Sequence, residues 1–147
     1  CALPICGVER ARAIAKQFNC GLAIIDKRRD KPNESAVMHI VGDVKDKHCL
    51  LVDDIVDTAG SLVNAANALR ENGAKSISAA ITHAVLSGPA VGRIQESVMD
   101  EVVVTDSIPL SETAKACSKI IQISIANLMG DAIKRINDQS SVSSLFI

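Results

Sequence analysis

Three carboxylates, a hydroxyl group and a run of small residues follow one another in the segment 52–61, which reads Val-Asp-Asp-Ile-Val-Asp-Thr-Ala-Gly-Ser. The apolar residues 49–52 have the pattern of a buried strand, and Asp53 and Asp54 close it at its carboxyl end. A small-residue turn follows, and apolar side chains at helical spacing then predict a helix over residues 61–72. Backbone N–H groups at the start of such a helix can bind a phosphate, helped by the helix dipole. Small residues let that phosphate come close to the backbone.

The paired carboxylates need a ligand of their own, because they would repel a phosphate. Ribose hydroxyl groups can donate hydrogen bonds to Asp53 and Asp54, and a Mg²⁺ ion can bridge carboxylate and phosphate oxygens. The structural alternative is that Asp57 or Thr58 simply caps the helix. We favour a binding site, since a cap does not explain two adjacent acids at the end of a buried strand.

Composition and charge exclude several other classes of function. The 147 residues are 48% apolar and 22% charged, which is typical of one globular domain. A net charge of −1 and only two Phe, with no Tyr or Trp, give no basis for nucleic-acid binding. Because no apolar stretch approaches the roughly 20 residues of a membrane span and no signal peptide is visible, we expect a cytoplasmic protein without a membrane partner. The five cysteines are odd in number and lack a Cys-x-x-Cys pair, so they predict neither a disulfide framework nor a metal site.

Strand and helix patterns alternate along the chain. Helices are expected over residues 7–18, 61–72 and 89–97, with a final amphipathic helix between 125 and 136, and strands over 22–26, 36–44, 49–54, 76–82, 101–105 and 120–123. This alternation predicts an α/β fold of three layers, a mostly parallel sheet with helices on both faces. Ligands of such sheets bind at the carboxyl ends of the strands. One rim should therefore collect Asp26 and Lys27, Asp53 and Asp54, Thr82 and His83, and Thr105 and Asp106.

The segment 52–61 resembles the phosphoribosyl pyrophosphate (PRPP) loop of type I phosphoribosyltransferase folds, and its particular form looks like that of the ribose-phosphate pyrophosphokinases, or PRPP synthetases. Five further blocks agree with that family in order, at residues 24–29, 37–43, 82–83, 87–91 and 141–146. The resemblance covers the chain except for its first six residues. It implies a single phosphoribosyltransferase-like domain over residues 1–147, equivalent to the C-terminal half of a synthetase without its N-terminal half.

The activity that the resemblance implies is that of a ribose-phosphate diphosphokinase in nucleotide biosynthesis. Such an enzyme transfers the diphosphate of ATP to the 1-hydroxyl of ribose 5-phosphate and gives PRPP and AMP, with Mg²⁺ as cofactor. By resemblance, Asp53 and Asp54 hold the ribose hydroxyls and contribute to a Mg²⁺ site. The 5-phosphate would be held by Asp57, Thr58, Ala59, Gly60 and Ser61, where Ser61 keeps the hydroxyl of the family's usual Thr.

Two further pairs of residues receive roles from the resemblance. Lys27 and Arg29 are implied to be catalytic, because cations that close over the transferring diphosphate stabilise its charge. Without the resemblance, this charge run would be interpreted as a solvated loop. Ser141 and Ser143 would belong to a regulatory phosphate or ADP site between subunits of a dimer or hexamer, although their position is also typical of a frayed tail.

Two other functions stay open at this point. A nucleobase phosphoribosyltransferase shares the acidic loop, and a non-catalytic regulatory subunit would bind PRPP or a ribose phosphate without reaction. The residues before Val8 read Ala-Leu-Pro-Ile-Cys-Gly and lack the Asp that the family has there near Mg²⁺ and nucleotide. We therefore expect this chain to bind its ligand but to make no PRPP alone. His83 is expected to be structural, because no activated nucleophile lies beside it in the sequence.

Overall fold

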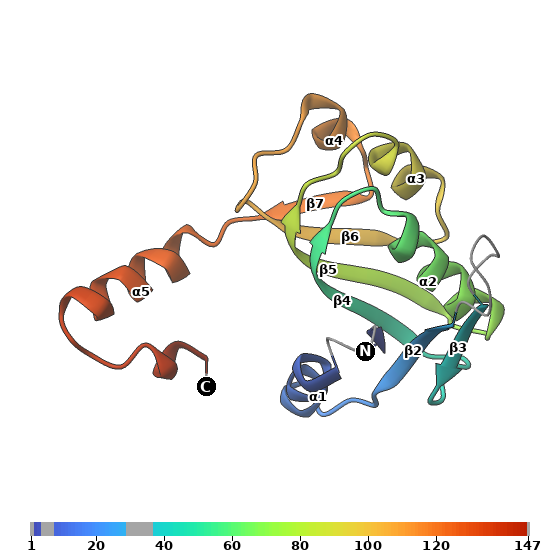
Figure 1. Cartoon of the computed structure of the whole chain (residues 1–147), viewed down its shortest axis with the longest axis horizontal. Coiled ribbons are helices and arrows are strands. Elements are labelled where there is room, and N and C mark those ends of the chain that lie inside the picture. Colours follow the sequence, from blue (N-terminus) through green and yellow to red (C-terminus); the bar gives the residue numbers. More distant parts are fainter. Residues whose placement is uncertain (1, 4–7, 29–36, 147) are drawn as a thin grey trace.

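A seven-stranded sheet forms the centre of the computed structural model, which describes residues 2–3, 8–28 and 37–146 (Figure 1). The strands are β1 (Ala2–Leu3), β2 (Ala23–Arg28), β3 (Val37–Val41), β4 (His48–Val56), β5 (Ser76–Ala84), β6 (Glu101–Thr105) and β7 (Ile120–Ile123). Their order across the sheet is β3-β2-β1-β4-β5-β6-β7. The β2–β3 pair is antiparallel and the other pairs are parallel.

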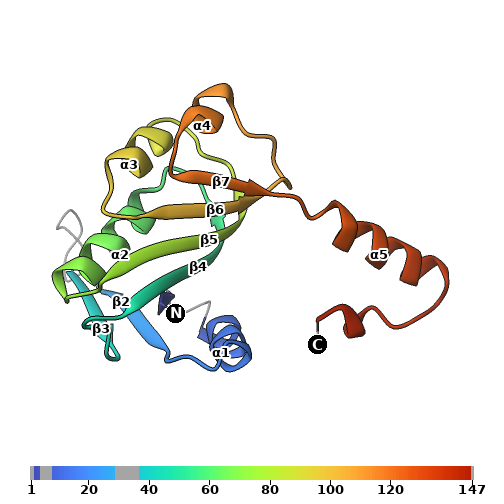
Figure 2. The ribbon, with the colours of Figure 1, turned by 180° about the vertical axis from the view of Figure 1, so that it is seen from behind.

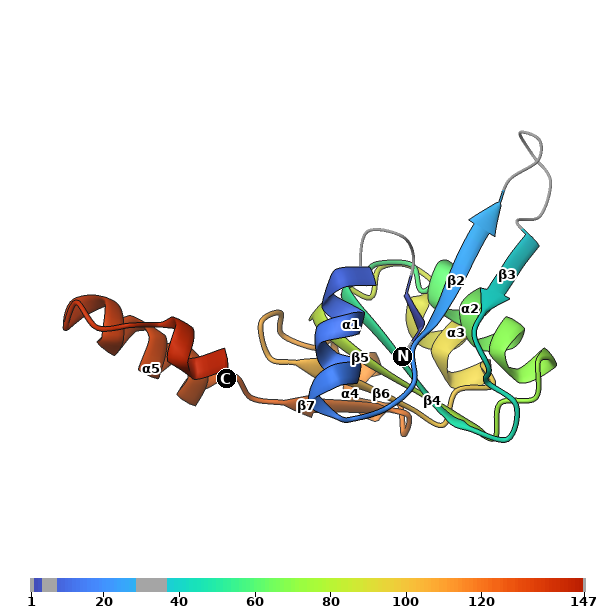
Figure 3. The same ribbon diagram turned by 90° about the horizontal axis from the view of Figure 1, so that it is seen from below.

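Helices cover both faces of this sheet, as the alternating pattern predicted. They are α1 (Val8–Gln17), α2 (Gly60–Glu71), α3 (Ala90–Glu96), α4 (Glu112–Ala116) and α5 (Ala126–Asn137), followed by the 3₁₀ turn η2 (Ser143–Phe146). Figures 1 and 3 show α2 and α3 on one face and α1 on the other. None of the helices in the described ranges is long and apolar enough to cross a membrane.

The core lies between β4–β6 and the helices α2 and α3. Burial alternates along β5, where Ile77 and Ala79 are fully buried. Because successive side chains of a strand point to opposite faces, this alternation fills one face with apolar groups. Leu69 of α2 and Ile94 of α3, both fully buried, pack against it. Small and aliphatic side chains thus fill the core of a chain that has almost no aromatic residues.

Strand pairing moves several boundaries from the predicted ones. The strands β2, β4 and β5 continue past the predicted ends at residues 26, 54 and 82, and β3 is shorter than the predicted 36–44. Backbone pairing of Arg28 with Val37, and of Val56 with Ala84, carries the strands past the predicted ends. The five-residue helix α4 was not predicted; its cap is Ser111, whose Oγ accepts a hydrogen bond from the Ala114 N–H at 3.2 Å. A helix this short carries almost no periodic signal.

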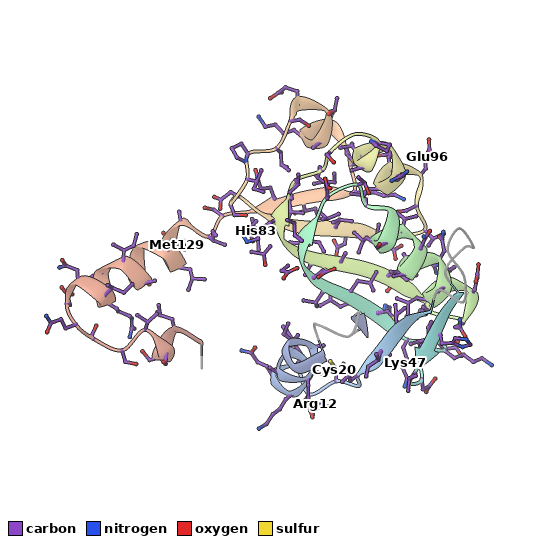
Figure 4. All side chains as sticks on the ribbon, viewed as in Figure 1. Arg12, Cys20, Lys47, His83, Glu96 and Met129 are labelled. Carbon is purple, nitrogen blue, oxygen red and sulfur yellow. The ribbon has the colours of Figure 1, made fainter. Side chains whose placement is uncertain are left out.

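The predicted amphipathic helix near the C-terminus is present as α5, but it stands away from the rest of the domain (Figures 1 and 2). No residue of α5 is buried. Its apolar side chains Leu128, Met129, Ile133 and Ile136 are 42–66% exposed, and Figure 4 shows Met129 on this helix. The amphipathic pattern therefore presents an apolar side that the described residues leave uncovered.

Arg70 fixes the carboxyl end of α2 to the loops around it. Its guanidinium donates to the backbone carbonyls of Ala74, Lys75 and Val98 at 3.1, 3.0 and 3.1 Å. We expect Arg70→Met to lower the free energy of unfolding by about 1–2 kcal/mol, since these carbonyls lose a charged donor. Urea unfolding measures the change, with the exposed Arg12→Met on α1 as control. Equal stability of the two variants would contradict this role.

Candidate functional site

The acidic segment lies at the carboxyl edge of the parallel strands. Asp53 and Asp54 were predicted to end β4, but the strand continues to Val56, so both acids belong to its last four residues. Asp53 is half-buried and Asp54 is exposed, and the Asp54 N–H donates to Asp53 Oδ1 at 3.0 Å. Both acids thus lie at the carboxyl end of β4, a few residues before the turn that leads into α2.

The turn from β4 to α2 gives the helix an uncapped start. Its N-cap residue is Ala59, with φ 59° and ψ 4°, and no side chain of the described residues caps it. The structural alternative, a helix simply capped by Asp57 or Thr58, is therefore not what the structure shows; the Asp57 carboxylate instead accepts a hydrogen bond from Ser87 Oγ. Successive N–H groups in a turn with a left-handed residue form a concavity that binds anions. The geometry thus suits a phosphate at residues 58–61.

Two residues that the sequence left without a role support this turn. Ser87, in the connection from β5 to α3, donates its backbone N–H to the Asp57 carbonyl at 3.1 Å. Arg93 of α3 donates from Nη1 to the Thr58 carbonyl at 2.9 Å. Ser87 falls in the block 87–91 that carried the family resemblance, and this was the one feature of the sequence that could have pointed to a role for it. Arg93 lies outside that block and has no sequence signal of its own.

Hydroxyl groups and an imidazole occupy the neighbouring strand ends. His83 Nδ1 lies 3.0 Å from Ser107 Oγ, and Thr105 Oγ1 donates to the Thr82 carbonyl at 2.6 Å. Figure 4 shows His83 at the same edge of the sheet. The carboxylate of Asp106 accepts hydrogen bonds from Ser124 and from the Ile125 N–H, which lower the pKa of Asp106 below its usual value. This strand end therefore contributes a polar network beside the acidic segment.

The remaining predicted residues lie in three other places. Lys27 was predicted to follow a strand that ends at residue 26, but it lies within β2, paired with Met38. The β2–β3 hairpin extends away from the rest of the sheet (Figure 3). Arg29, and residues 4–7 where the family's Asp is missing, lie outside the described residues. Ser141 and Ser143 follow α5; the Ser141 carbonyl accepts from Arg135 Nη1 at 2.9 Å.

A metal ion at this rim of the sheet would need some of its ligands from a bound phosphate compound. Within the described residues, no three His, Cys, Asp or Glu side chains gather in a way that could hold a metal. Asp53 and Asp54 nevertheless suit Mg²⁺, which binds in nucleotide enzymes through one or two carboxylates, with phosphates and water completing its octahedron. The carboxylate pair fits the ion as a bridge to a bound phosphate.

A cavity of about 310 Å³ lies at the opposite end of the sheet, between α1 and the start of β4. Phe18, Leu22 and Val44 line it together with the free thiols of Cys20 and Cys49. Burial raises the pKa of Cys49, so this thiol stays protonated at neutral pH. The acids and the anion-binding turn all lie at the other end, so we place the candidate site at the rim.

Comparisons with known proteins agree with the sequence resemblance. Residues 23–147 match the model of the phosphoribosyl synthetase-associated domain. The ribose-phosphate pyrophosphokinases of Nitrosomonas europaea and Caulobacter vibrioides are 57% and 59% identical over 141 residues, 96% and 95% of this chain and 45% of each relative. The crystal structure of phosphoribosylpyrophosphate synthetase from Mycobacterium smegmatis matches with a TM-score of 0.84 and 36% identity, over 95% of this chain and 44% of that one. The chain thus spans less than half the length of these relatives.

Proposed function

The chain belongs to the phosphoribosyl synthetase-associated domain family, and from this we propose that it is the ribose 5-phosphate-binding domain of a ribose-phosphate diphosphokinase. The carrying observation is the start of α2 at Gly60, which follows Asp53 and Asp54 within a few residues and has no side-chain cap. In our proposal, the N–H groups of residues 58–61 bind the 5-phosphate. The two carboxylates accept hydrogen bonds from the ribose hydroxyls.

In the proposed reaction, the 1-hydroxyl of ribose 5-phosphate attacks the β-phosphorus of ATP, the bond from that phosphorus to the bridging α-β oxygen breaks, and AMP leaves. Phosphoryl transfers of this kind depend on positioning and charge stabilisation rather than on a covalent intermediate. The turn 58–61 and the carboxylates would position the sugar with its 1-hydroxyl next to the β-phosphorus of ATP. Mg²⁺ held by Asp53 and Asp54 would neutralise phosphate charge.

We propose further that Lys27 and Arg29 are the cations that stabilise the transferring diphosphate. Lys27 lies near the end of β2, and Arg29 follows it in the connection to β3. A cation that contacts the diphosphate only in the transition state would raise the rate of transfer without tightening sugar binding. This pair belongs to the proposal because the relatives named ribose-phosphate pyrophosphokinase match the chain throughout this region.

Oligomeric assembly is also part of the proposal. The apolar side of α5 is exposed at Leu128, Met129, Ile133 and Ile136, and a surface of this kind is typical of a contact with another domain or subunit. Ser141 and Ser143 follow α5 directly and are exposed. We propose that they contribute to a regulatory phosphate or ADP site formed with a neighbouring subunit.

Ligand binding and product assays separate this function from its two alternatives. We expect calorimetry to show that the chain binds ribose 5-phosphate and PRPP in competition, because the two share a 5-phosphate and a diol. We expect no pyrophosphate release from PRPP with adenine, guanine, hypoxanthine, uracil or orotate, and no AMP release from Mg-ATP and ribose 5-phosphate. The lack of AMP release is expected because the family's Asp before Val8 is missing and because the chain has only two Phe, and no Tyr or Trp, to stack an adenine.

Each outcome has one meaning. Pyrophosphate release with any base would identify a nucleobase phosphoribosyltransferase, and AMP release would show that this domain carries the whole reaction. Failure to bind either sugar phosphate would overturn the proposed function. The same assays on a longer protein that contains this domain test the second alternative, a non-catalytic regulatory subunit. AMP release would exclude it, whereas sugar-phosphate binding without AMP release would establish it.

A further inference from the structure

Residues 85–93, which we call the clamp segment, hold the back of the anion-binding turn. The N–H groups of Val85 and Leu86 both donate to the Val56 carbonyl, at 3.0 and 3.2 Å. Ser87 donates twice to Asp57, from its backbone N–H to the carbonyl at 3.1 Å and from Oγ to the carboxylate. Arg93 Nη1 completes the set with its bond to the Thr58 carbonyl at 2.9 Å. Five hydrogen bonds thus join the clamp segment to three consecutive residues.

Two of these bonds set the direction of the N–H groups that face the ligand. The carbonyl of each residue and the N–H of the next belong to one planar trans peptide group, in which they point in opposite directions. The Ser87 bond to the Asp57 carbonyl therefore fixes the direction of the Thr58 N–H. In the same way, the Arg93 bond to the Thr58 carbonyl fixes the direction of the Ala59 N–H. Both donors then point away from the clamp segment.

The backbone at Ala59 needs this support. Its φ of 59° lies in the left-handed region, which costs an alanine free energy that a glycine would not lose. Ala59 is 4% exposed, and the next residue, Gly60, begins α2. Without the Arg93 bond, the Thr58–Ala59 peptide group could rotate and turn its N–H away from the ligand. A donor bound at the carbonyl also polarises the N–H of the same peptide group and strengthens it as a donor.

Arg93 also brings charge to the site. Its Nη1 lies 3.5 Å from the position that a Cβ on Gly60 would occupy, so the cation is adjacent to the first residue of α2. Ser87 acts in the same sense, because its hydroxyl group engages the Asp57 carboxylate and so reduces the repulsion between that carboxylate and an incoming phosphate. The clamp segment therefore favours a dianionic phosphate ester over a neutral ligand.

We propose that Arg93 and Ser87 are positioning residues, which orient the N–H groups of Thr58 and Ala59 toward the 5-phosphate and act through the backbone rather than by touching the sugar. The inference rests on the proposed function for the identity of the ligand. It adds to that function two residues on which the affinity of the turn depends, Ser87 and Arg93, which are 30 and 35 positions away in sequence from the residues that they bind.

The test compares Arg93→Met with Arg70→Met. Both arginines donate to backbone carbonyls, but Arg70 does so at the far end of α2. We expect Arg93→Met to raise the Kd of ribose 5-phosphate and of inorganic phosphate about tenfold, which is the loss expected for one charge-assisted bond. Arg93→Lys should recover part of the affinity, and Ser87→Ala should show a smaller loss. Arg70→Met should lower Tm and leave both Kd values unchanged.

A second readout separates positioning from direct contact. In the ligand-free protein, the amide ¹⁵N resonance of Ala59 should shift in Arg93→Met, because it reports on the hydrogen bond at the Thr58 carbonyl. Weakened binding with an unshifted Ala59 resonance would show that Arg93 contacts the phosphate itself, and the inference would be wrong. It would also be wrong if the wild type binds both ligands and Arg93→Met binds them equally well. If the wild type binds neither, the proposed function fails first and the inference fails with it.

Discussion

A Gly60→Val chain is expected to fold like the wild type and to bind ribose 5-phosphate at least about a hundredfold more weakly, since the phosphate loses two or more charge-assisted hydrogen bonds to backbone N–H groups. Gly60 is the first residue of α2, at the centre of the turn that we assign to the phosphate. A branched side chain there fills space that the phosphate must enter to reach the backbone. Calorimetry gives the affinity, and circular dichroism with thermal unfolding reports on the fold.

The structure offers a matched control for this change. A Cβ on Gly60 would lie 3.5 Å from Arg93 Nη1 and 3.9 Å from Thr58 Oγ1, which are ordinary contacts, and the φ of Gly60 is not in the left-handed region. The fold therefore accepts a side chain at this position, and Gly60→Ala should be stable and lose less affinity than Gly60→Val. Wild-type affinity in the valine variant would place the phosphate somewhere else.

Asp54→Ala should weaken the binding of ribose 5-phosphate but not that of inorganic phosphate. We expect the Kd of ribose 5-phosphate to rise about ten- to hundredfold, because a sugar hydroxyl loses a charged acceptor. Inorganic phosphate, which has no hydroxyl groups of a sugar, should bind as well as before or more tightly, since a repelling negative charge is removed. Asp53→Ala should change the binding of the two ligands in the same way. Calorimetry with both ligands measures this contrast.

Two controls accompany the aspartate variants. Asp138→Ala removes an exposed acid at the end of α5 and should leave both affinities unchanged. The second control is 2-deoxyribose 5-phosphate, which lacks the 2-hydroxyl. The variant whose missing carboxylate bound that hydroxyl should bind 2-deoxyribose 5-phosphate and ribose 5-phosphate with the same Kd. If Asp54→Ala and Asp53→Ala weaken both ligands equally, the acids support the turn and do not hold the sugar.

The fold class followed from patterns that are local in sequence. The strands β6 and β7 begin and end where apolar runs predicted them, because each run is short and bounded by polar residues. The strands β2, β4 and β5 extend beyond their predicted ends, since their last residues pair with residues of neighbouring strands that are distant in sequence. Pairing is a long-range property, so single-sequence patterns do not contain it.

The same distinction applies to the candidate site. The segment 53–61 could be recognised because its acids, small residues and helix start are consecutive. The support from Ser87 and Arg93 could not, because their bonds to Asp57 and Thr58 form only when β5 has paired with β4. Residue types alone also left a capped start of α2 open as an alternative, since Asp57 and Thr58 are both good cap residues. In the fold, the Asp57 carboxylate instead accepts a hydrogen bond from Ser87 Oγ.

A crystal structure of the chain with ribose 5-phosphate would test the assignment of the site most directly. We expect the phosphate oxygens to lie about 2.7–3.2 Å from backbone nitrogens of residues 58–61, the range of N–H···O hydrogen bonds, and the ribose hydroxyls to face Asp53 and Asp54. Arg93 should keep its bond to the Thr58 carbonyl in the complex. Ribose 5-phosphate bound instead in the cavity between α1 and the start of β4, with residues 58–61 unoccupied, would contradict the site and the function proposed from it.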